Sequence, residues 1–337
     1  MESDILGTVA SFPSQVAEAF ASAKDLVFPS SFGKVSNIVV LGMGGSGIVG
    51  DFLRVLLRNS SIPVYVSKHS FPPCFVNENS LVLAITNSGK TQETLDALET
   101  CINFTTQIVA VTNDHELESR CGEKNVPCIM IPKNGHTRSS LGYLLVPLLC
   151  MLQNASILRK VNYDVMETIE VLNKIKKECS PDLPLRRNPA RSLAFDLLDR
   201  FPVIYGEQNF TDAAAIRWKQ LFNENSKVHC YYDLFPELLH NEIEAWDSST
   251  YENYALIVLR DSIYEREIGL QGKIKATKSL VEQKGAKIFE FWSQGRSELA
   301  RLLSLSYLGD FASVYLGIAR GIDTSSVHNI ELIKGGL

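Results

Sequence analysis

Two segments of the sequence join a hydrophobic run to a loop of glycine and hydroxyl residues. The first spans residues 37–47 and is NIVVLGMGGSG, and the second spans residues 81–91 and is LVLAITNSGKT. Glycines let the backbone approach an anion, and hydroxyls donate hydrogen bonds to its oxygens. A helix after each loop would add unpaired N–H groups and the positive end of its dipole. The two segments therefore predict a phosphate-binding site.

The first loop also matches the dinucleotide fingerprint GxGxxG over residues 42–47. An NAD site needs, in addition, an acidic residue at the end of the next strand, where it binds the ribose hydroxyls. The next hydrophobic run, Val64–Val66, is followed by the residues SKH and has no carboxylate there. Ser46, within the turn, is better placed to bind a phosphate or a sugar, so the pattern disfavours a nicotinamide cofactor.

The second loop is a degenerate match to the nucleotide P-loop, with Ala84 at the position of the first glycine. Because Ile85 has the character of a last strand residue, only a short turn remains. That turn presents three hydroxyl groups, those of Thr86, Ser88 and Thr91. Three hydroxyls suit one phosphate monoester better than a triphosphate, which also needs a magnesium-binding carboxylate. Use of ATP stays as a minority alternative.

Three further residues carry groups that could move protons or stabilise charge. Arg138 lies where a polar loop enters an apolar segment, and a cation beside a phosphate site stabilises an anionic intermediate. Glu224 follows a predicted helix and precedes a predicted strand, a junction where α/β folds commonly place catalytic groups. Glu224 as base and His240 as second proton shuttle would form the acid–base pair that an isomerisation needs.

Each of these three residues also has an ordinary structural interpretation. Most arginines at such borders extend to solvent or pair with a surface carboxylate. Glu224 taken alone suits a solvated helix end, and His240 suits a packing position. The histidines show no spacing typical of metal ligands, so we expect no metal site.

Short apolar runs without alternation predict strands that are buried on both faces, as in parallel sheets. We expect strands at Ile38–Leu41, Val64–Val66, Leu81–Ile85, Ile108–Val111, Val203–Tyr205, Val228–Tyr232, Tyr254–Leu259 and Lys287–Trp292. Helical patterns lie between them at Val49–Asn59, Gln92–Asn103, Asp212–Phe222 and Ile268–Lys284, and Tyr143–Leu158 predicts a buried helix. Alternation of strand and helix indicates an α/β fold with parallel sheets.

The second set of strands and helices repeats the first in order and in approximate spacing, which indicates two similar α/β domains. A chain of 337 residues is long enough for two domains at roughly 150 residues each. Three prolines in Lys176–Arg191 mark a connection between them. We place the N-terminal domain at residues 1–157, the connecting segment at 158–191 and the C-terminal domain with its tail at 192–337.

Bulk properties exclude several classes of protein. The composition is that of a globular chain, and a formal charge of −5 argues against a nucleic-acid partner. Seven cysteines without a C-x-x-C pair indicate reduced thiols and a cytoplasmic location. The N-terminal region lacks the pattern of a signal peptide, and the most apolar stretch is too short to span a membrane, so we expect no membrane partner.

Taken together, several motifs resemble those of the bifunctional phosphoglucose/phosphomannose isomerases of archaea and some bacteria. Each motif is weak alone, but jointly they are specific and cover nearly the whole chain. They are Gly42–Gly47, Thr86–Thr91, Arg138–Tyr143, Arg217–Asn225, Phe235–Glu242, Asp310–Val314 and Arg320–Asp323.

The resemblance implies two sugar isomerase domains of flavodoxin-like type, each a doubly wound parallel sheet. It further implies a homodimer with shared active sites and no cofactor. The implied substrate is a small sugar phosphate: glucose 6-phosphate or mannose 6-phosphate is converted reversibly to fructose 6-phosphate through a cis-enediolate.

The resemblance also implies a role for each site residue. Gly44, Gly45, Ser46, Thr86, Ser88 and Thr91 would bind the phosphate and sugar. Glu224 would be the base that moves a proton between C1 and C2, and Arg138 would stabilise the enediolate. His240 from the neighbouring subunit would open the sugar ring, assisted by Lys334.

The chain departs from the family pattern at the phosphate turn and before the arginine. Thr86 replaces a usual serine and keeps the hydroxyl, and Lys90 replaces a usual asparagine and adds a charge. Thr137 stands where a proline is common. The alternative from another class is a sugar-phosphate-binding regulator with isomerase-type domains and no catalysis. Such a regulator needs the phosphate loops but not Glu224, His240 or Arg138.

Overall fold

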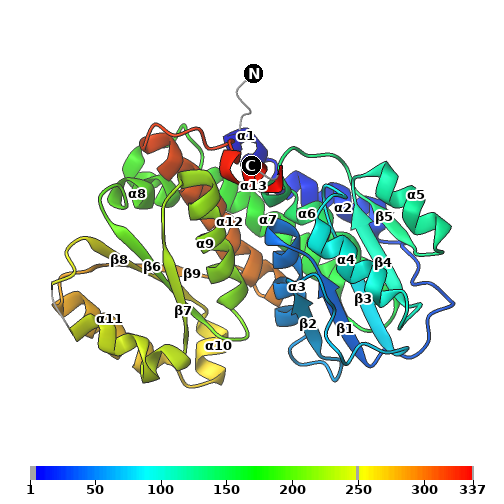
Figure 1. Ribbon diagram of the computed structural model, residues 1–337. Helices are drawn as coiled ribbons and strands as arrows, with labels where there is room; N and C mark the ends of the chain where they lie inside the picture. Colours follow the sequence, from blue (N-terminus) through cyan, green and yellow to red (C-terminus); the bar gives the residue numbers. More distant parts are fainter. Residues whose placement is uncertain (1–4, 248–249, 336–337) are drawn as a thin grey trace. The chain divides into compact units, whose positions relative to one another are not determined.

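The computed structural model describes residues 5–247 and 250–335 (Figure 1). These residues form two compact units, each with its own parallel sheet. The N-terminal unit comprises Phe12–Ile169. The C-terminal unit runs from Glu170 onward and includes helix α1 (Ile5–Ala10) from the start of the chain. We describe each unit by itself.

The N-terminal unit is built on five parallel strands in the spatial order β2-β1-β3-β4-β5 (Figure 1). The strands are β1 (Asn37–Leu41), β2 (Val64–Ser67), β3 (Ser80–Ile85), β4 (Ile108–Thr112) and β5 (Cys128–Met130). Strand β1 pairs with β2 on one side and with β3 on the other. The chain therefore runs from β1 to β2, crosses back over β1 to β3, and continues away from β2 through β4 and β5. This order is that of flavodoxin-like doubly wound folds.

Helices cover both faces of this sheet. They are α2 (Phe12–Ala23), α3 (Gly44–Leu56), α4 (Gln92–Cys101), α5 (His115–Glu123) and α6 (Leu141–Asn154). Helices α4 and α5 pack with Val39 and Ala84 into one core cluster. Helix α3 lies on the other face, because Gly50 contacts Val40 and Val66. Side chains of neighbouring residues in β1 therefore pack against helices on opposite faces of the sheet, as expected of a sheet buried on both sides.

The C-terminal unit repeats this topology with one strand fewer, in the order β7-β6-β8-β9. Its strands are β6 (Phe201–Glu207), β7 (Tyr231–Phe235), β8 (Tyr254–Arg260) and β9 (Lys287–Trp292), and all are parallel. Strand β6 lies between β7 and β8, just as β1 lies between β2 and β3. The prediction of two similar doubly wound α/β folds is confirmed.

The helices of the C-terminal unit surround this sheet. Besides α1 they are α8 (Pro189–Asp196), α9 (Asp212–Ser226), α10 (Ser262–Glu267), α11 (Gln271–Gln283), α12 (Glu298–Ala319) and α13 (His328–Lys334), with 3₁₀ helices η3 (Glu237–His240) and η4 (Glu242–Asp247). Helix α12 is long and apolar enough to cross a membrane, but 83% of its apolar window is buried. Its contacts with α1, α8 and α9 are those of a core helix.

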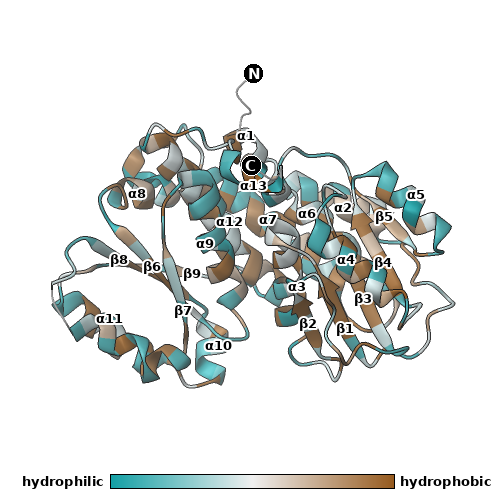
Figure 2. Ribbon diagram, in the orientation of Figure 1, coloured by the Kyte–Doolittle hydropathy of each residue, from teal (hydrophilic) through white to brown (hydrophobic). Residues whose placement is uncertain are grey.

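The hydropathy of the residues follows this layering. In Figure 2 the central strands of the N-terminal sheet are largely brown, whereas α5 at the surface is mainly teal. All residues of β3 and β4 are buried, and so are six of the seven residues of β8. The prediction of burial on both faces thus holds for the central strands, whereas the predicted strands β2, β7 and β9 lie at sheet edges and are only partly buried.

The segment between the two sheets is helical. Residues 158–191, which we expected to be a connecting segment, hold helix α7 (Val161–Glu178), the 3₁₀ helix η2 (Leu185–Arg187) and the start of α8. The division between the units falls inside α7. Pro189 is accommodated because it occupies the first turn of α8, where a backbone N–H has no hydrogen-bond partner within the helix. The missing N–H of proline therefore costs no hydrogen bond.

Several predicted element bounds differ from the structure. The strand predicted at Val228–Tyr232 is β7 and begins only at Tyr231, because Asn223 binds the carbonyl of Val228 and holds that residue at the end of α9. Helix α3 begins at Gly44, so part of the glycine loop is the first helical turn. Helix α9 runs to Ser226, not Phe222. Residues 262–283 form two helices, α10 and α11, rather than one beginning at Ile268.

Candidate active site

The carboxyl ends of β1 and β3 lie side by side where the strand order of the N-terminal sheet reverses. In open α/β sheets this reversal leaves a crevice in which ligands bind. The two glycine and hydroxyl loops follow these two strands directly, so the fold brings them together at this crevice. The prediction that both loops belong to one binding site therefore agrees with the topology.

Glycines are required in the first loop for two separate reasons. Gly44 has a φ of +50°, a left-handed conformation that residues with a side chain rarely adopt. Gly45 lies against the backbone of Arg138, since a Cβ at Gly45 would be 3.1 Å from the Arg138 nitrogen. Ser46 is buried, and its hydroxyl accepts a hydrogen bond from the backbone N–H of Asn87 at 3.3 Å. The first loop is thus in contact with the second loop and with the Arg138 segment.

The second loop presents its hydroxyls at the end of β3. Thr86 is buried and its hydroxyl lies 3.3 Å from that of Thr91, whereas Ser88 is exposed. Gly89 has a φ of +65°, and a Cβ there would lie 2.3 Å from the Cβ of Asp114. The loop therefore packs tightly on Asp114 at the start of α5, and this contact helps to fix the shape of the loop.

The helices that follow both loops begin without a side-chain cap. Met43 precedes α3 and Thr91 precedes α4, and neither side chain binds a backbone N–H of its helix. In contrast, Asp114 caps α5 through the N–H of Leu117 at 2.9 Å. Uncapped N–H groups and the positive end of the dipole favour an anion. The crevice thus has the donors that a phosphate group needs.

Arg138 lies in the 3₁₀ helix η1 (Thr137–Ser139) and is 5% exposed. This short helix follows β5 and precedes α6 in the chain, and its first residue, Thr137, contacts Gly45 through Cγ2. The backbone of Arg138 therefore belongs to the same local cluster as Ser46 and Asn87. Its guanidinium group is a buried cation in the same unit as the phosphate loops.

Glu224 lies in the last turn of α9, where it is half-buried. The residues around it anchor α9 to α12. Arg217 forms a buried ion pair with Asp310, with 2.8 Å between nitrogen and oxygen, and Asn225 donates to the hydroxyl of Ser313 at 3.0 Å. The motifs Arg217–Asn225 and Asp310–Val314 are thus two sides of one helix–helix contact. That contact fixes the position of Glu224 within the C-terminal unit.

His240 and Lys334 lie at the ends of short helices in the C-terminal unit. His240 is the last residue of η3, and Lys334 is the last residue of α13. Both side chains are exposed. Their assignment to ring opening stays a prediction.

The equivalent crevice of the C-terminal unit is occupied by the protein's own charges. Strand β8 passes into α10 with only Asp261 between them, whereas a loop of six residues, 86–91, separates β3 from α4. Asp261 accepts the N–H of Tyr264 at 2.7 Å and the hydroxyl of Ser293 at 2.5 Å, and it pairs with Arg301. Asp261 therefore caps α10 with its side chain, whereas Thr91 at the start of α4 makes no such cap.

A second carboxyl group closes this crevice. Glu207 ends β6 and is fully buried. Burial and a hydrogen bond with Glu265 raise the pKa of Glu207 to about 10, so that Glu207 carries a proton at neutral pH. Arg260 in turn binds Glu265, with 2.6 Å between Nη2 and Oε2. Of the two sheets in the described part of the chain, only the N-terminal one thus offers its crevice to a phosphate from solution.

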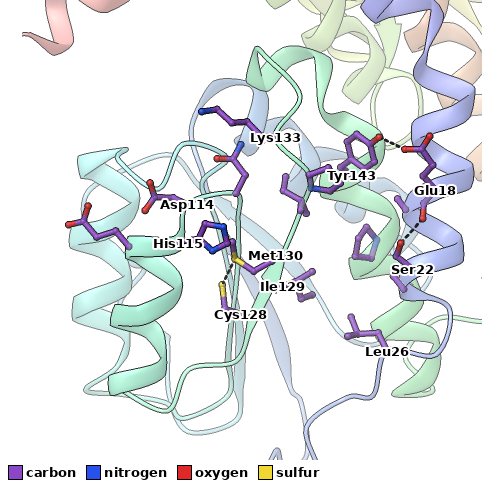
Figure 3. Close-up of a pocket in the computed structure, with 17 residues that line it drawn as sticks. Glu18, Ser22, Leu26, Asp114, His115, Cys128, Ile129, Met130, Lys133 and Tyr143 are labelled. Carbon is purple, nitrogen blue, oxygen red and sulfur yellow. Dashed lines mark hydrogen bonds between the residues drawn. The ribbon is translucent and has the colours of Figure 1, made fainter.

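A separate hollow of about 1100 Å³ lies beside the edge strand β5, between that strand and α2 (Figure 3). Met130, His115 and Tyr143 line it, and the Tyr143 hydroxyl donates to Glu18 at 2.5 Å. Burial and the neighbouring Glu18 raise the pKa of Tyr143 to about 12. The described residues that line this hollow include none of the predicted site residues, so the hollow is separate from the predicted phosphate site.

Sequence reasoning missed one residue of the crevice, Asn87. It is buried between Thr86 and Ser88, and its side chain contacts Thr137 and Asn113. The sequence offered one signal, because an amide inside a loop of hydroxyls can bind neighbouring loops as readily as a ligand. Its partners lie 50 and 26 residues away and could not be identified without the fold.

Two families match separate parts of the chain. The family described as "Bacterial phospho-glucose isomerase C-terminal SIS domain" matches residues 186–337, and the family described as "SIS domain" matches residues 31–137. These two matches correspond to the sheets of the C-terminal and N-terminal units.

Curated relatives match the chain along nearly its whole length. A bifunctional phosphoglucose/phosphomannose isomerase of Caldicellulosiruptor bescii is 32% identical over 333 residues, which cover 98% of each chain. The protein of the same name from Thermoplasma volcanium is 33% identical over 329 residues, covering 95% of this chain and 98% of the relative.

Solved structures share the fold at low sequence identity. A hypothetical protein from Thermus thermophilus matches with a TM-score of 0.76 and 15% identity, over 99% of this chain and 90% of its own. The C-terminal domain of glucosamine-fructose-6-phosphate aminotransferase from Francisella tularensis matches with a TM-score of 0.74 and 16% identity, over 96% and 98% of the two chains.

Proposed function

This chain belongs to the family of bifunctional phosphoglucose/phosphomannose isomerases, and we propose that it interconverts glucose 6-phosphate, mannose 6-phosphate and fructose 6-phosphate. The observation that carries this proposal is the open crevice of the N-terminal sheet. Ser46, Thr86 and Thr91 surround two helix N-termini that have no side-chain cap. One phosphate monoester fits this set of donors.

The phosphate group is remote from the carbons that react, and it supplies binding energy that orients them. Hydroxyls of the second loop and the N–H groups of α3 and α4 hold it. Lys90, exposed in the same loop, adds positive charge near this site. The sugar carbons are then presented to the acid–base groups.

Glu224 is the base of the proposed reaction. It removes the proton from C2 of the open-chain aldose, and the electron pair passes through the new C1–C2 double bond onto O1. The cation of Arg138 stabilises this cis-enediolate. Glu224 then returns the proton to C1 while the O2 hydroxyl proton passes to O1, which gives the ketose. The steps move only protons and use no redox cofactor.

One base serves both epimers because the enediolate is planar at C2. Glucose and mannose 6-phosphate differ only in the configuration of that carbon, so both give the same intermediate after rotation about C2–C3. A single Glu224 is therefore sufficient for the two activities.

The proposal extends to the assembly and to ring opening. We propose a cytoplasmic homodimer in which His240 from the neighbouring subunit opens the ring of the sugar, assisted by Lys334. The support for this part is the family resemblance and the exposure of both side chains.

A coupled assay with fructose 6-phosphate and no added metal tests the proposed function. We expect both glucose 6-phosphate and mannose 6-phosphate to appear. Glu224→Gln keeps the size of the side chain but cannot take up a proton, so it should lower kcat by roughly 10² to 10⁴ while fructose 6-phosphate still binds. Binding is measured by calorimetry on the same variant.

Two outcomes would contradict the proposal. Near wild-type turnover by Glu224→Gln would refute the role of the glutamate. Binding of fructose 6-phosphate by the wild-type chain, with neither aldose formed, would identify a sugar-phosphate-binding regulator instead of an enzyme.

A further inference from the structure

Asn87 occupies an unusual place in the second phosphate loop. Its neighbour Ser88 is exposed, but Asn87 is only 5% exposed. A polar amide that is buried in this way needs hydrogen-bond partners, because an unpaired one is costly. The partners of Asn87 come from three different segments of the N-terminal unit.

The polar groups of Asn87 bind three different segments. The backbone N–H donates to the hydroxyl of Ser46 in the first phosphate loop at 3.3 Å. The side-chain Nδ2 donates to the hydroxyl of Thr137 at 3.2 Å, and Oδ1 accepts from Nδ2 of Asn113 at 3.1 Å. The backbone carbonyl also accepts the N–H of Asn113 at 3.2 Å. Asn87 thus joins the second phosphate loop, to which it belongs, to the first phosphate loop, to η1 and to the residue that follows β4.

The contact with Thr137 matters because Arg138 is the next residue. Thr137 begins η1, and its methyl group and carbonyl carbon lie against Gly45 of the first phosphate loop. Packing on Gly45 and the hydrogen bond from Asn87 hold the first residue of η1, and Asn134 donates to the carbonyl of its last residue, Ser139, at 3.0 Å. A shift of about 1 Å in a group that stabilises an intermediate can cost roughly 10²-fold in rate.

We propose that Asn87 is a positioning residue that holds the Arg138 turn where the guanidinium group stabilises the enediolate. The proposal rests on the proposed isomerase function. Asn87 acts through Thr137 and Arg138. Its removal should therefore change the rate of proton transfer more than the binding of the phosphate.

Asn87→Ala removes both side-chain hydrogen bonds but keeps the backbone N–H that binds Ser46. We expect kcat for fructose 6-phosphate to fall about 10- to 100-fold. The dissociation constant of inorganic phosphate, measured by calorimetry, should change by no more than about threefold, because the hydroxyls of Thr86 and Thr91 remain. A loss of stability alone would not produce this split.

Asn87→Asp gives a different expected result. A carboxylate can accept from Asn113 and from the Thr137 hydroxyl, so the geometry is kept, but a negative charge stands beside the phosphate. We expect KM for fructose 6-phosphate to rise at least about 10-fold and to fall again as ionic strength rises, because salt screens the repulsion.

Two further sets of variants separate positioning from folding. Thr137→Val removes the hydroxyl partner alone and should lower kcat as Asn87→Ala does, whereas Thr137→Ser should recover most of that kcat. The double variant Asn87→Ala/Thr137→Val should be no slower than the slower single variant. Asn154→Ala is the matched control, since this asparagine also makes two side-chain hydrogen bonds in the N-terminal unit, to Lys24 and Leu26. It should lower Tm and leave kcat and KM unchanged.

The outcomes distinguish this proposal from the proposed function. A wild-type kcat in Asn87→Ala, with wild-type turnover established, would overturn the role of Asn87 and leave the isomerase intact. Equal losses of kcat and phosphate affinity would also overturn it. Absence of turnover in the wild-type chain would refute the proposed function, and the positioning role that depends on it would fall with it.

Discussion

Among single residues, Glu207 couples the stability of the C-terminal unit to pH. Burial and the hydrogen bond with Glu265 raise its pKa from 4.5 to about 10. The folded chain therefore keeps a proton that the unfolded chain releases between these values. Stability falls as pH rises through this window, with a limiting slope of about 1.4 kcal/mol per pH unit for one proton.

Glu207→Gln should remove most of this slope, because the amide has nearly the same shape and can still donate to Glu265. We expect a gain in Tm that is larger at about pH 9 than at about pH 6, measured by scanning calorimetry. Glu290→Gln is the control, since Lys278 and Arg260 lower the pKa of Glu290, and it should give no such gain. A gain that does not depend on pH would contradict a protonated Glu207.

The contrast between Ser46 and Asn87 shows how far single residues can be predicted. Ser46, Thr86 and Thr91 could be proposed as phosphate ligands because strand, loop and helix follow one another locally in the sequence. Asn87 was not, because its importance depends on Thr137 and Asn113, which reach it only through tertiary structure. The charges that fill the second crevice could not be predicted for the same reason, because Glu207 and Asp261 lie 54 residues apart in the sequence.

Among the elements, the contact of α9 with α12 is the one to test because it carries Glu224. The two helices approach closely at glycines of α12. A Cβ at Gly309 would lie 2.4 Å from the Nε1 atom of Trp218, and a Cβ at Gly317 would lie 2.6 Å from the carbonyl oxygen of Asn225. The indole N–H of Trp218 also donates to the carbonyl of Leu305 at 2.8 Å.

Gly309→Ala should destabilise the chain by roughly 1–3 kcal/mol, because the added methyl displaces the buried indole. Gly272→Ala is the matched control: this glycine lies in α11, where an added Cβ meets nothing within 4 Å. Alanine is the better helix former, so Gly272→Ala should stabilise the chain by up to about 1 kcal/mol. Urea unfolding measures both. Equal effects of the two substitutions would show that α9 and α12 are not in tight contact.

Helices and strands were predicted well where hydrophobicity alone determines the position of the element. The central strands of both sheets were found because buried runs such as Leu81–Ile85 have no other plausible location. Strand β5 was missed because its three residues are too short a pattern. The start of β7 was misplaced because the side chain of Asn223, not hydropathy, decides where α9 ends.

For the whole molecule, the proposed homodimer makes a prediction about mixed subunits. If His240 and Glu224 of one active site come from different subunits, a dimer of one Glu224→Gln chain and one His240→Ala chain has one intact site and one doubly altered site. Mixing the two inactive variants under conditions of subunit exchange should then restore activity, up to about a quarter of the wild-type specific activity for random pairing.

The same mixture gives no recovery if each subunit completes its own site, since every site then carries one defect. The control is a mixture of Glu224→Gln with wild type, which should show activity proportional to the number of intact sites. Recovery without any change of subunit pairing, as judged by mass spectrometry of the dimers, would contradict the shared site.

The aspartate that closes the second crevice, Asp261, has a consequence for the lifetime of the folded chain. The two units share a doubly wound topology, which places converging amide donors at the reversal in both. In the C-terminal unit the carboxylate of Asp261 binds these donors, so this crevice needs no ligand from solution. In the N-terminal unit the proposed sugar phosphate would take this place, and its concentration would then adjust how long that unit survives unfolding and proteolysis.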